Sequence, residues 1–286
     1  MEISELEQFL NSLRTDFSVT TIGQSVLGKN LYSVSKIVDK DLSYVLVVAG
    51  MHAREHLACD LVCKLIEDCT RENLNYNICF VPLINPDGVQ LCKQGVDGLD
   101  EEISQKLVEI NRGNNFSLYK ANANGVDLNN NWPANWEQKF SNKTFPSSQG
   151  FYGYKPLSEP ENVALKKLTE KLKPKLVISF HLKGEEIYFD FFQDKNRYKR
   201  DRKVAKIFAK STGYKIKSTE KKSSGGYKDW CVQKLKNTAL TIELGKDKFD
   251  HPFPKEQLSQ IYKKNIKFYE NIEKSLKIIK KYEEFS

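Results

Sequence analysis

The chain has 286 residues, of which 40% are hydrophobic, 29% are charged and 11% are aromatic, and its formal net charge is +8. This length can bury the core of one domain, and the apolar fraction excludes an intrinsically disordered chain. Because no stretch approaches the roughly 18 consecutive apolar residues of a membrane span, we predict a protein that does not cross a membrane.

The predicted elements alternate between short apolar runs, which indicate strands, and longer segments with helical apolar spacing. In chain order they are helix Ser4–Leu13, strand Leu31–Ile37, strand Tyr44–Ala49, helix Glu55–Thr70, strand Ile78–Ile84, helix Glu101–Ile110, helix Glu159–Leu172, strand Leu176–His181, strand Glu186–Phe192, helix Lys199–Thr212, helix Tyr227–Lys234, strand Thr238–Leu244 and helix Pro254–Tyr282. This alternation predicts an α/β fold: one three-layer domain, residues 1–286, in which a mixed, mostly parallel twisted sheet has helices on both faces.

The predicted helix Ser4–Leu13 belongs to an acidic, amphipathic segment, whereas a secretory signal is basic and then apolar. We therefore predict a cytoplasmic protein. The six cysteines agree with this location, because most lie in apolar runs and none forms a CxxC pair. We expect them to be reduced and buried rather than paired in disulfides.

The excess of basic residues has several explanations: binding of nucleic acid, binding to an anionic surface, an acidic small substrate, or solubility alone. Much of it lies in the predicted helix Pro254–Tyr282, where Ile261, Phe268 and Ile272 recur at helical spacing. We interpret this segment as a solvated helix with one face on the core. Because no nucleic-acid-binding motif accompanies it, we predict no nucleic-acid partner.

Three metal-ligating side chains follow predicted buried strands. His52 comes shortly after Tyr44–Ala49, Glu55 follows three residues later, and His181 ends Leu176–His181. Sheets of this class carry their chemistry at the carboxyl ends of their strands. Each histidine alone is explained as a hydrogen-bonded residue at a strand end, but their joint placement favours a His, Glu, His zinc site.

A fourth candidate is Glu243, near the end of the predicted strand Thr238–Leu244 and flanked by apolar residues. An unpaired carboxylate is unfavourable in such a run. Glu243 therefore either pairs with a cation or serves as an acid or base beside the metal.

Seven motifs occur in the order in which zinc carboxypeptidases of the carboxypeptidase A type carry them. They are GMHAREH at 50–56, NPDG (Asn85–Gly88), GVDLNNNWP (Gly125–Pro133), YGYKPLSEPE (Tyr152–Glu161), SFH (Ser179–His181), GGYKDW (Gly225–Trp230) and TIELG (Thr241–Gly245). The chain resembles this family from about Ile22 to Phe253, and the resemblance implies a zinc metallopeptidase with that family's fold.

By this resemblance, His52, Glu55 and His181 bind one zinc ion per chain. Glu243 matches the general base that takes a proton from zinc-activated water and passes it to the leaving amine. Arg112 lies seventeen residues before Asn129, at the family's spacing for the arginine that polarises the scissile carbonyl.

Four further positions match the family's substrate-binding residues and depart from its usual pattern. Asn129 matches an asparagine that helps to hold the terminal carboxylate, but its neighbour is Asn130 where an ordinary carboxypeptidase has arginine. Lys221 falls at the position of the substrate-capping tyrosine, and Lys228 falls at the floor of the specificity pocket. A basic floor favours a substrate side chain that carries a carboxylate.

The motifs SFHLKGE (Ser179–Glu185), YKAN (Tyr119–Asn122) and GVDLN without the arginine resemble one branch, the bacterial γ-D-glutamyl-diaminopimelate peptidases. The resemblance implies cleavage of the γ-D-glutamyl bond to meso-diaminopimelate, or another diamino acid, in peptidoglycan stem peptides of the bacterial cell wall. The expected partner is thus an acidic peptide. Two alternatives remain at this point: a carboxypeptidase that removes acidic C-terminal residues, and an inactive fold that only binds a peptide or acidic polymer.

Overall fold

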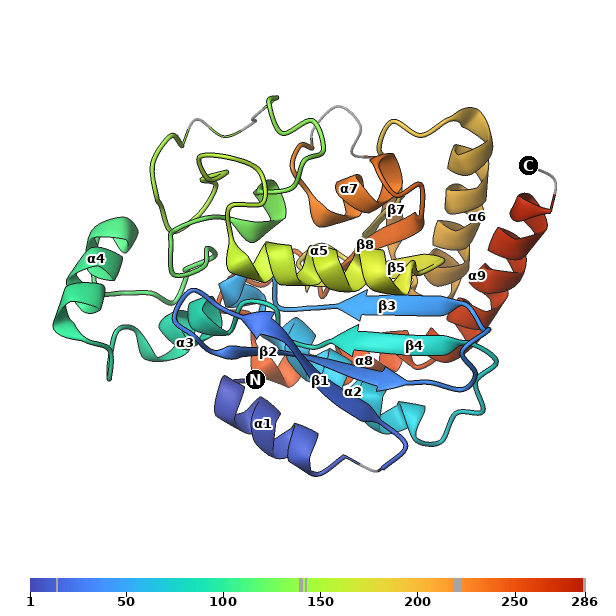
Figure 1. The fold of residues 1–286 in the computed structure, drawn as a ribbon, viewed down its shortest axis with the longest axis horizontal. Helices are drawn as coiled ribbons and strands as arrows, with labels where there is room; N and C mark the ends of the chain where they lie inside the picture. Colours follow the sequence, from blue (N-terminus) through green and yellow to red (C-terminus); the bar gives the residue numbers. More distant parts are fainter. Residues whose placement is uncertain (14, 139–140, 142, 219–222, 285–286) are drawn as a thin grey trace.

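A mixed sheet forms the middle layer of the molecule in the computed structural model, which describes residues 1–13, 15–138, 141, 143–218 and 223–284 (Figure 1). In the described residues the sheet has eight strands in the order β1-β2-β4-β3-β5-β8-β6-β7. Their bounds are β1 Ser18–Gln24, β2 Asn30–Lys36, β3 Tyr44–Val48, β4 Asn77–Val81, β5 Leu176–Leu182, β6 Glu186–Tyr188, β7 Lys215–Lys217 and β8 Thr238–Leu244.

The centre of the sheet is parallel and its flanks are mixed. Strands β4, β3, β5 and β8 run parallel, whereas β1 and β2, β2 and β4, and β6 and β8 pair in the antiparallel sense. All four central strands therefore end at one edge of the sheet. In the register of β5 and β8, His181 lies opposite Glu243.

Helices cover both faces of the sheet. The α-helices are α1 Ile3–Asn11, α2 Leu57–Cys69, α3 Pro86–Gln94, α4 Glu101–Asn111, α5 Pro160–Leu172, α6 Lys195–Thr212, α7 Tyr227–Gln233, α8 Leu258–Asn265 and α9 Phe268–Glu283, and short 3₁₀ turns are η1 Ala53–Glu55, η2 Leu128–Asn130 and η3 Lys255–Gln257. The three-layer α/β prediction is confirmed.

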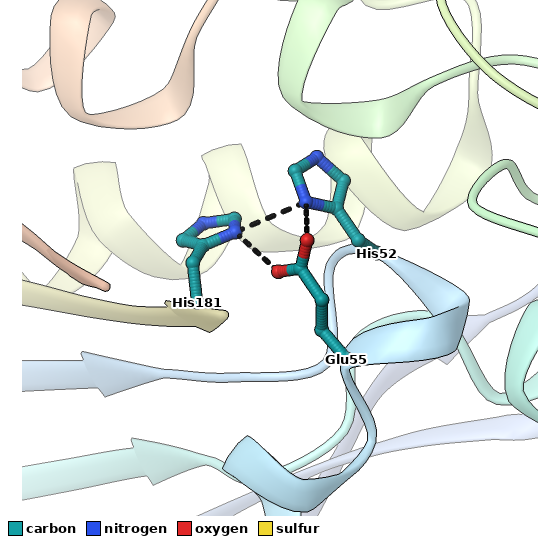
Figure 2. A group of neighbouring side chains, drawn as sticks. All are labelled: His52, Glu55 and His181. Atoms are coloured by element: carbon teal, nitrogen blue, oxygen red, sulfur yellow. Dashed lines mark hydrogen bonds and ion pairs between the residues drawn. The ribbon is translucent and has the colours of Figure 1, made fainter. Parts of the chain in front are cut away.

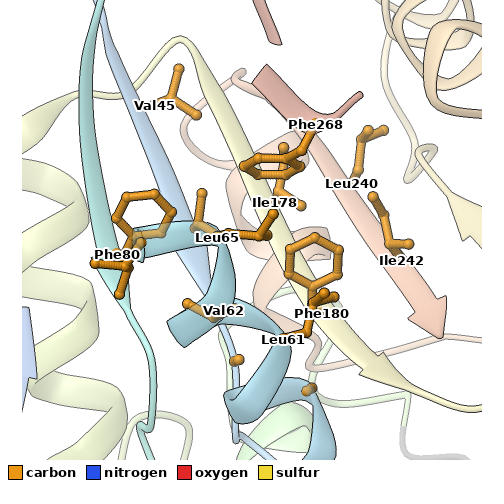
Figure 3. Packing of buried hydrophobic residues seen from close by; sticks show 14 of the residues in the cluster. Val45, Leu61, Val62, Leu65, Phe80, Ile178, Phe180, Leu240, Ile242 and Phe268 are labelled. Carbon is orange, nitrogen blue, oxygen red and sulfur yellow. The ribbon is translucent and has the colours of Figure 1, made fainter. Parts of the chain in front are cut away.

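The two faces bury different apolar residues because side chains alternate along a strand. Val45 and Val47 of β3 pack toward α1, α2, α6, α8 and α9, as do Phe180 and Ile242, in the cluster drawn in Figure 3. Leu46 and Val48 point to the opposite face, where α5 and α7 contribute residues such as Leu165 and Trp230. The central strands are thus apolar on both sides.

Four predicted strands are found with their bounds shifted or shortened, Leu176–His181 is one residue longer as β5, and Thr238–Leu244 agrees fully with β8. The predicted strand Ile78–Ile84 ends at Val81, and helix α3 follows it without having been predicted. Strands β1 and β7 were also missed, because β1 is a polar edge strand with most residues exposed and β7 has only three residues. The predicted helix Pro254–Tyr282 is divided into η3, α8 and α9.

A third apolar cluster lies beneath α3 and α4, away from the main sheet. It contains Leu91, Leu107, Phe116, Tyr119 and Ala121, together with Ala53 from the η1 turn. This cluster fixes the loop that follows α4 against the turn that carries Glu55.

Two further findings concern the cysteines and the helices. All six cysteines are free, and five of them are buried. No helix in the described ranges is both long and apolar enough to cross a bilayer.

Candidate metal centre and active site

His52, Glu55 and His181 meet where β3 and β5 end (Figure 2). Their inward atoms are close: His52 Nδ1 lies 2.8 Å from Glu55 Oε1, His181 Nδ1 lies 3.0 Å from Glu55 Oε2, and the two Nδ1 atoms are 3.2 Å apart. In the part of the chain that the structure describes, this is the one group of three or more His, Cys, Asp or Glu placed to hold a metal ion.

The path from β3 to His52 needs a glycine. Gly50 has φ +69°, and a Cβ at this position would lie 2.7 Å from Cys59 Sγ and 2.8 Å from Leu83 Cδ1. A larger residue would therefore be strained and would clash with the core. The turn lets the chain leave the buried strand and enter η1, which presents Glu55 beside His52.

Partners outside the cluster orient both imidazoles. His52 Nε2 lies 3.2 Å from Asp127 Oδ1, and His181 Nε2 lies 3.1 Å from Ser179 Oγ. Glu55 Oε2 also accepts the backbone N–H of Leu182 at 3.2 Å. Because outer contacts of this kind turn the remaining ring nitrogen toward a metal, both Nδ1 atoms are presented to the same point.

The donor set fits zinc. Two imidazole nitrogens and one carboxylate are a common protein ligand set for catalytic zinc, and ligands about 2.0 to 2.1 Å from a tetrahedral ion lie about 3.3 Å from one another. The observed separations of 2.8 to 3.2 Å approach that value. The three residues thus converge as the sequence predicted.

Buried charges determine the electrostatics of this cluster. Burial lowers the pKa of His52, but the Glu55 and Asp127 carboxylates outweigh it and leave that pKa raised. Burial raises the pKa of Glu55, but the two histidines outweigh it and hold it well below its ordinary value. Glu55 is therefore an ionised carboxylate, as a metal ligand must be.

Glu243 lies beside His181 at the end of β8, and it borders a cavity of about 390 Å³. Burial raises the pKa of the Glu243 carboxyl to about 8, while the His181 charge acts in the opposite direction. A carboxyl whose pKa approaches the working pH is suited to accept and return a proton.

The cavity beside Glu243 presents charges of both signs. Lys228 Nζ lies 2.5 Å from Asp229 Oδ1 and donates to the Asp190 carbonyl oxygen at 2.7 Å. The Nζ of Lys217, on the edge strand β7, lies 3.5 Å from Glu186 Oε1. Both described lysines that line the cavity, Lys217 and Lys228, are therefore accompanied by a carboxylate.

The other predicted site residues lie in three different settings. Asn129 borders the cavity, and its Oδ1 accepts the backbone N–H of Tyr227 at 3.0 Å. Asn130 is half-buried in the adjoining η2 turn. Arg112 is exposed at the end of α4, with its guanidinium 5.5 Å from the centre of the Phe145 ring. Lys221 lies outside the described residues.

Two residues of the site were not singled out from the sequence, although both lie within motifs. Asp127 belongs to GVDLNNNWP, and its carboxylate lies beside His52 Nε2. Lys120 belongs to YKAN, and its Nζ lies 3.1 Å from Asp127 Oδ2. The signal for Asp127 is chemical, because a metal-binding histidine regularly has a carboxylate behind it. No comparable rule points to the lysine.

Comparison with known families and proteins agrees with this geometry. A family model described as zinc carboxypeptidase matches residues 4–268. The chain is 31% identical over 266 residues to an uncharacterized protein, YqgT, of Bacillus subtilis, covering 86% of this chain and 69% of that protein. It is 30% identical over 265 residues to gamma-D-glutamyl-L-diamino acid endopeptidase 1 of Lysinibacillus sphaericus, covering 86% of this chain and 65% of that protein.

Other matches are shorter or more distant. Murein peptide amidase A of Escherichia coli is 32% identical over 143 residues, which cover 48% of each chain. Among solved structures, bovine thrombin-activatable fibrinolysis inhibitor superposes with a TM-score of 0.73 at 18% identity, covering 96% of this chain and 95% of that one. The murein-tripeptide amidase of Escherichia coli superposes with a TM-score of 0.56 at 23% identity, covering 89% and 91%. These two structural matches show a shared fold.

Proposed function

The chain belongs to the zinc carboxypeptidase family and is a zinc metallopeptidase, and we propose that it hydrolyses the γ-D-glutamyl bond to meso-diaminopimelate or another diamino acid in peptidoglycan stem peptides. The names of two relatives, a gamma-D-glutamyl-L-diamino acid endopeptidase and a murein peptide amidase, support this substrate class.

The observation that carries the proposal is the pairing of charges in the cavity beside Glu243. The end of a meso-diaminopimelate side chain has one ammonium and one carboxylate. The cavity is lined by both residues of the Lys228–Asp229 pair and by Lys217, the basic member of the Lys217–Glu186 pair, so both substrate charges find an opposite charge. A purely acidic side chain would meet carboxylates as well as ammonium groups, which is unfavourable.

The position of Asn130 supports the same proposal. An ordinary carboxypeptidase clamps the terminal carboxylate with an arginine here, and a planar guanidinium binds a carboxylate through two parallel hydrogen bonds. Asparagine is shorter and uncharged and cannot replace that clamp. A substrate recognised mainly through its charged side chain depends less on the missing contact.

In this mechanism His52, Glu55 and His181 hold the zinc ion. When bound, zinc supplies a Lewis acid that polarises a carbonyl and makes water more acidic. Glu243 takes a proton on a carboxylate oxygen from the attacking water and returns it to the nitrogen of the leaving diamino acid. Asn129 and the Lys228–Asp229 pair orient the substrate on the side of the leaving group.

The proposal is tested by mass spectrometry of digests of L-Ala-γ-D-Glu-meso-diaminopimelate by the zinc-loaded protein, with Glu243→Gln as the control. We expect free diaminopimelate from the wild type and at least a hundredfold less from the variant. A parallel digest uses an α-linked peptide that ends in glutamate. Cleavage of that peptide alone would establish the acidic carboxypeptidase instead.

Introducing the missing arginine gives a second test of the same choice. With Asn130→Arg, an enzyme that depends on the terminal carboxylate should gain activity toward the α-linked peptide. The proposed murein enzyme should lose activity toward its γ-linked substrate or remain unchanged. If zinc binds and neither peptide is cleaved by the wild type or the variant, the proposed substrate is wrong.

A further inference from the structure

Helix α6 carries a large local excess of positive charge. Its 18 residues include eight lysines and arginines and one acidic residue, Asp201, so this helix contributes +7 to a formal net charge of +8. Figure 1 shows α6 at the outside of the molecule, beside α9. The basic balance of the chain is therefore concentrated on one surface helix.

The exposed basic residues of α6 share one face of the helix, which we call the basic face. They are Lys195, Lys199, Arg202, Lys203, Lys206 and Lys210. At about 100° per residue, all six lie within an arc of about 100°, and they span about 22 Å along the helix axis. The structure describes α6 in full, and its one acidic residue, Asp201, is buried. The opposite face carries Val204 and Phe208, which pack in the core.

The cations of the basic face are available to an external partner. The ion pairs described for α6 use its other two basic residues, Arg197 and Arg200, each paired with an aspartate nearby in the chain. Within the basic face, Lys203 has a described contact of another kind, with its Nζ 5.1 Å from the centre of an aromatic ring of α9. Like charges at successive turns of a helix repel one another, and a nearby anionic surface removes that repulsion.

An exposed aromatic ring lies three residues before the basic face begins. Phe192 is 52% exposed, whereas its neighbour Phe191 is fully buried. The backbone of Phe192 has φ +50°, a left-handed conformation that a bulky residue rarely adopts. Neither the strained backbone nor the exposed ring stabilises the protein in water, so both point to a partner that takes up an apolar group.

We propose that the basic face of α6 docks the protein on the anionic surface of a lipid bilayer, with the Phe192 ring in the interface. Each lysine or arginine near such a surface strengthens binding about fivefold, and an apolar group that enters the headgroup region adds to this attraction. A hydrated linear polyanion would neutralise the lysines but leave the ring exposed, so the combination favours lipid. The inference is independent of the proposed hydrolysis, because none of these residues is among the described residues that line the cavity beside Glu243 or form the metal centre.

Co-sedimentation with vesicles tests the proposal on the full chain and needs no peptide substrate. The anionic vesicles are phosphatidylcholine with about one third phosphatidylglycerol, and pure phosphatidylcholine is the neutral comparison. We expect the wild type to sediment with the anionic vesicles alone. Raising the salt from about 0.1 M to about 0.5 M should release it, because the Debye length becomes shorter. Equal binding to both kinds of vesicle, or binding to neither, would overturn the inference.

Two double variants separate the basic face from the net charge of the protein. Lys206→Gln with Lys210→Gln should weaken binding to the anionic vesicles about 20-fold or more, at about fivefold per lysine. Lys167→Gln with Lys171→Gln is the matched control, because it removes two exposed lysines at the same spacing from α5, on the opposite face of the sheet. The control should bind within about twofold of wild type. Equal weakening in both double variants would refute a role for α6, since only the net charge would then matter.

Removal of the ring tests the choice of lipid. Phe192→Asn introduces a residue that tolerates the left-handed backbone, and it should weaken vesicle binding about fivefold or more because no ring enters the interface. If this variant does not fold, Phe192→Gly is measured in its place. Vesicle binding equal to that of wild type, or tighter binding of the wild type to a single-stranded oligonucleotide than to the vesicles, would contradict the choice of lipid and indicate a soluble polyanion.

Discussion

Glu161 makes the stability of the fold depend on pH in a direction that can be measured. Its side chain is fully buried in the first turn of α5, where Oε1 accepts the N–H of Val26 at 3.2 Å and Oε2 accepts Asn122 Nδ2 at 3.1 Å. Burial raises the pKa of Glu161 to about 8, and the Asp87 charge adds to this rise. Hydrogen bonds from its own backbone N–H, from Asn122 and from Val26 lower the pKa but compensate only in part.

The sign of the effect follows from the two pKa values. Unfolded Glu161 ionises near its ordinary pKa of 4.5, whereas the folded protein keeps the proton until about pH 8. Between these values the folded state binds more protons, so its stability falls as the pH rises. At 1.36 kcal/mol per pH unit, the whole window corresponds to about 4 to 5 kcal/mol for this one group.

Glu161→Gln removes the titration and leaves a side chain of the same shape. Urea unfolding at pH 5, 7 and 9 gives the free energy of unfolding of the variant minus that of the wild type. This difference should rise by about 4 kcal/mol from pH 5 to pH 9, because most of the window lies between these two values and the contributions of all other groups cancel. Glu170→Gln, at an exposed position of the same helix, should give a flat difference. A change below about 1 kcal/mol for Glu161→Gln would refute the reasoning, because Glu161 would then be ionised throughout.

Three further predictions concern the site. Asp127→Asn should weaken zinc binding about 10- to 100-fold, because the amide is a poorer partner for His52 Nε2. Chelator competition measures the zinc Kd, and an unchanged Kd would contradict the role of Asp127. Glu55→Gln should bind less than a tenth of the wild-type zinc in elemental analysis, whereas Glu243→Gln should keep full occupancy; equal zinc content in both variants would contradict the ligand assignment. Lys228→Met should lower the free energy of unfolding by about 3 to 5 kcal/mol, because it leaves the buried Asp229 carboxylate without its cation. Urea unfolding measures this, with Lys234→Met as the control. Equal stability of the two variants would contradict the prediction.

The sequence was most informative where local pattern and topology coincide. His52, Glu55 and His181 follow apolar strands, and parallel strands end at a common edge, so their convergence could be predicted without coordinates. Glu243 was reached by the same argument from β8.

The sequence was least informative where a long loop decides the outcome. Arg112 was chosen by its spacing from Asn129, but the structure places it exposed at the C-terminal end of helix α4. Lys120 became visible only through its contacts with Asp127 and Ala53. Similarly, the spacing that places Lys228 at the pocket could not reveal its partner Asp229, although the two are adjacent in sequence.

The order of the strands also has a consequence for how the molecule assembles. Strand β8 lies between β5 and β6, although β6 and β7 precede it in the chain. Strands β6 and β7 pair with each other, and in the described residues β8 is the one strand that connects this pair to the rest of the sheet. The pair therefore joins the sheet only when β8 pairs with β5. Insertion of this one strand therefore brings Glu243 to the metal ligands and adds the wall that carries Tyr188 and Lys217 at the same time. The base and this wall of the pocket therefore depend on the same strand pairing, so a change that keeps β8 from pairing with β5 should remove both together.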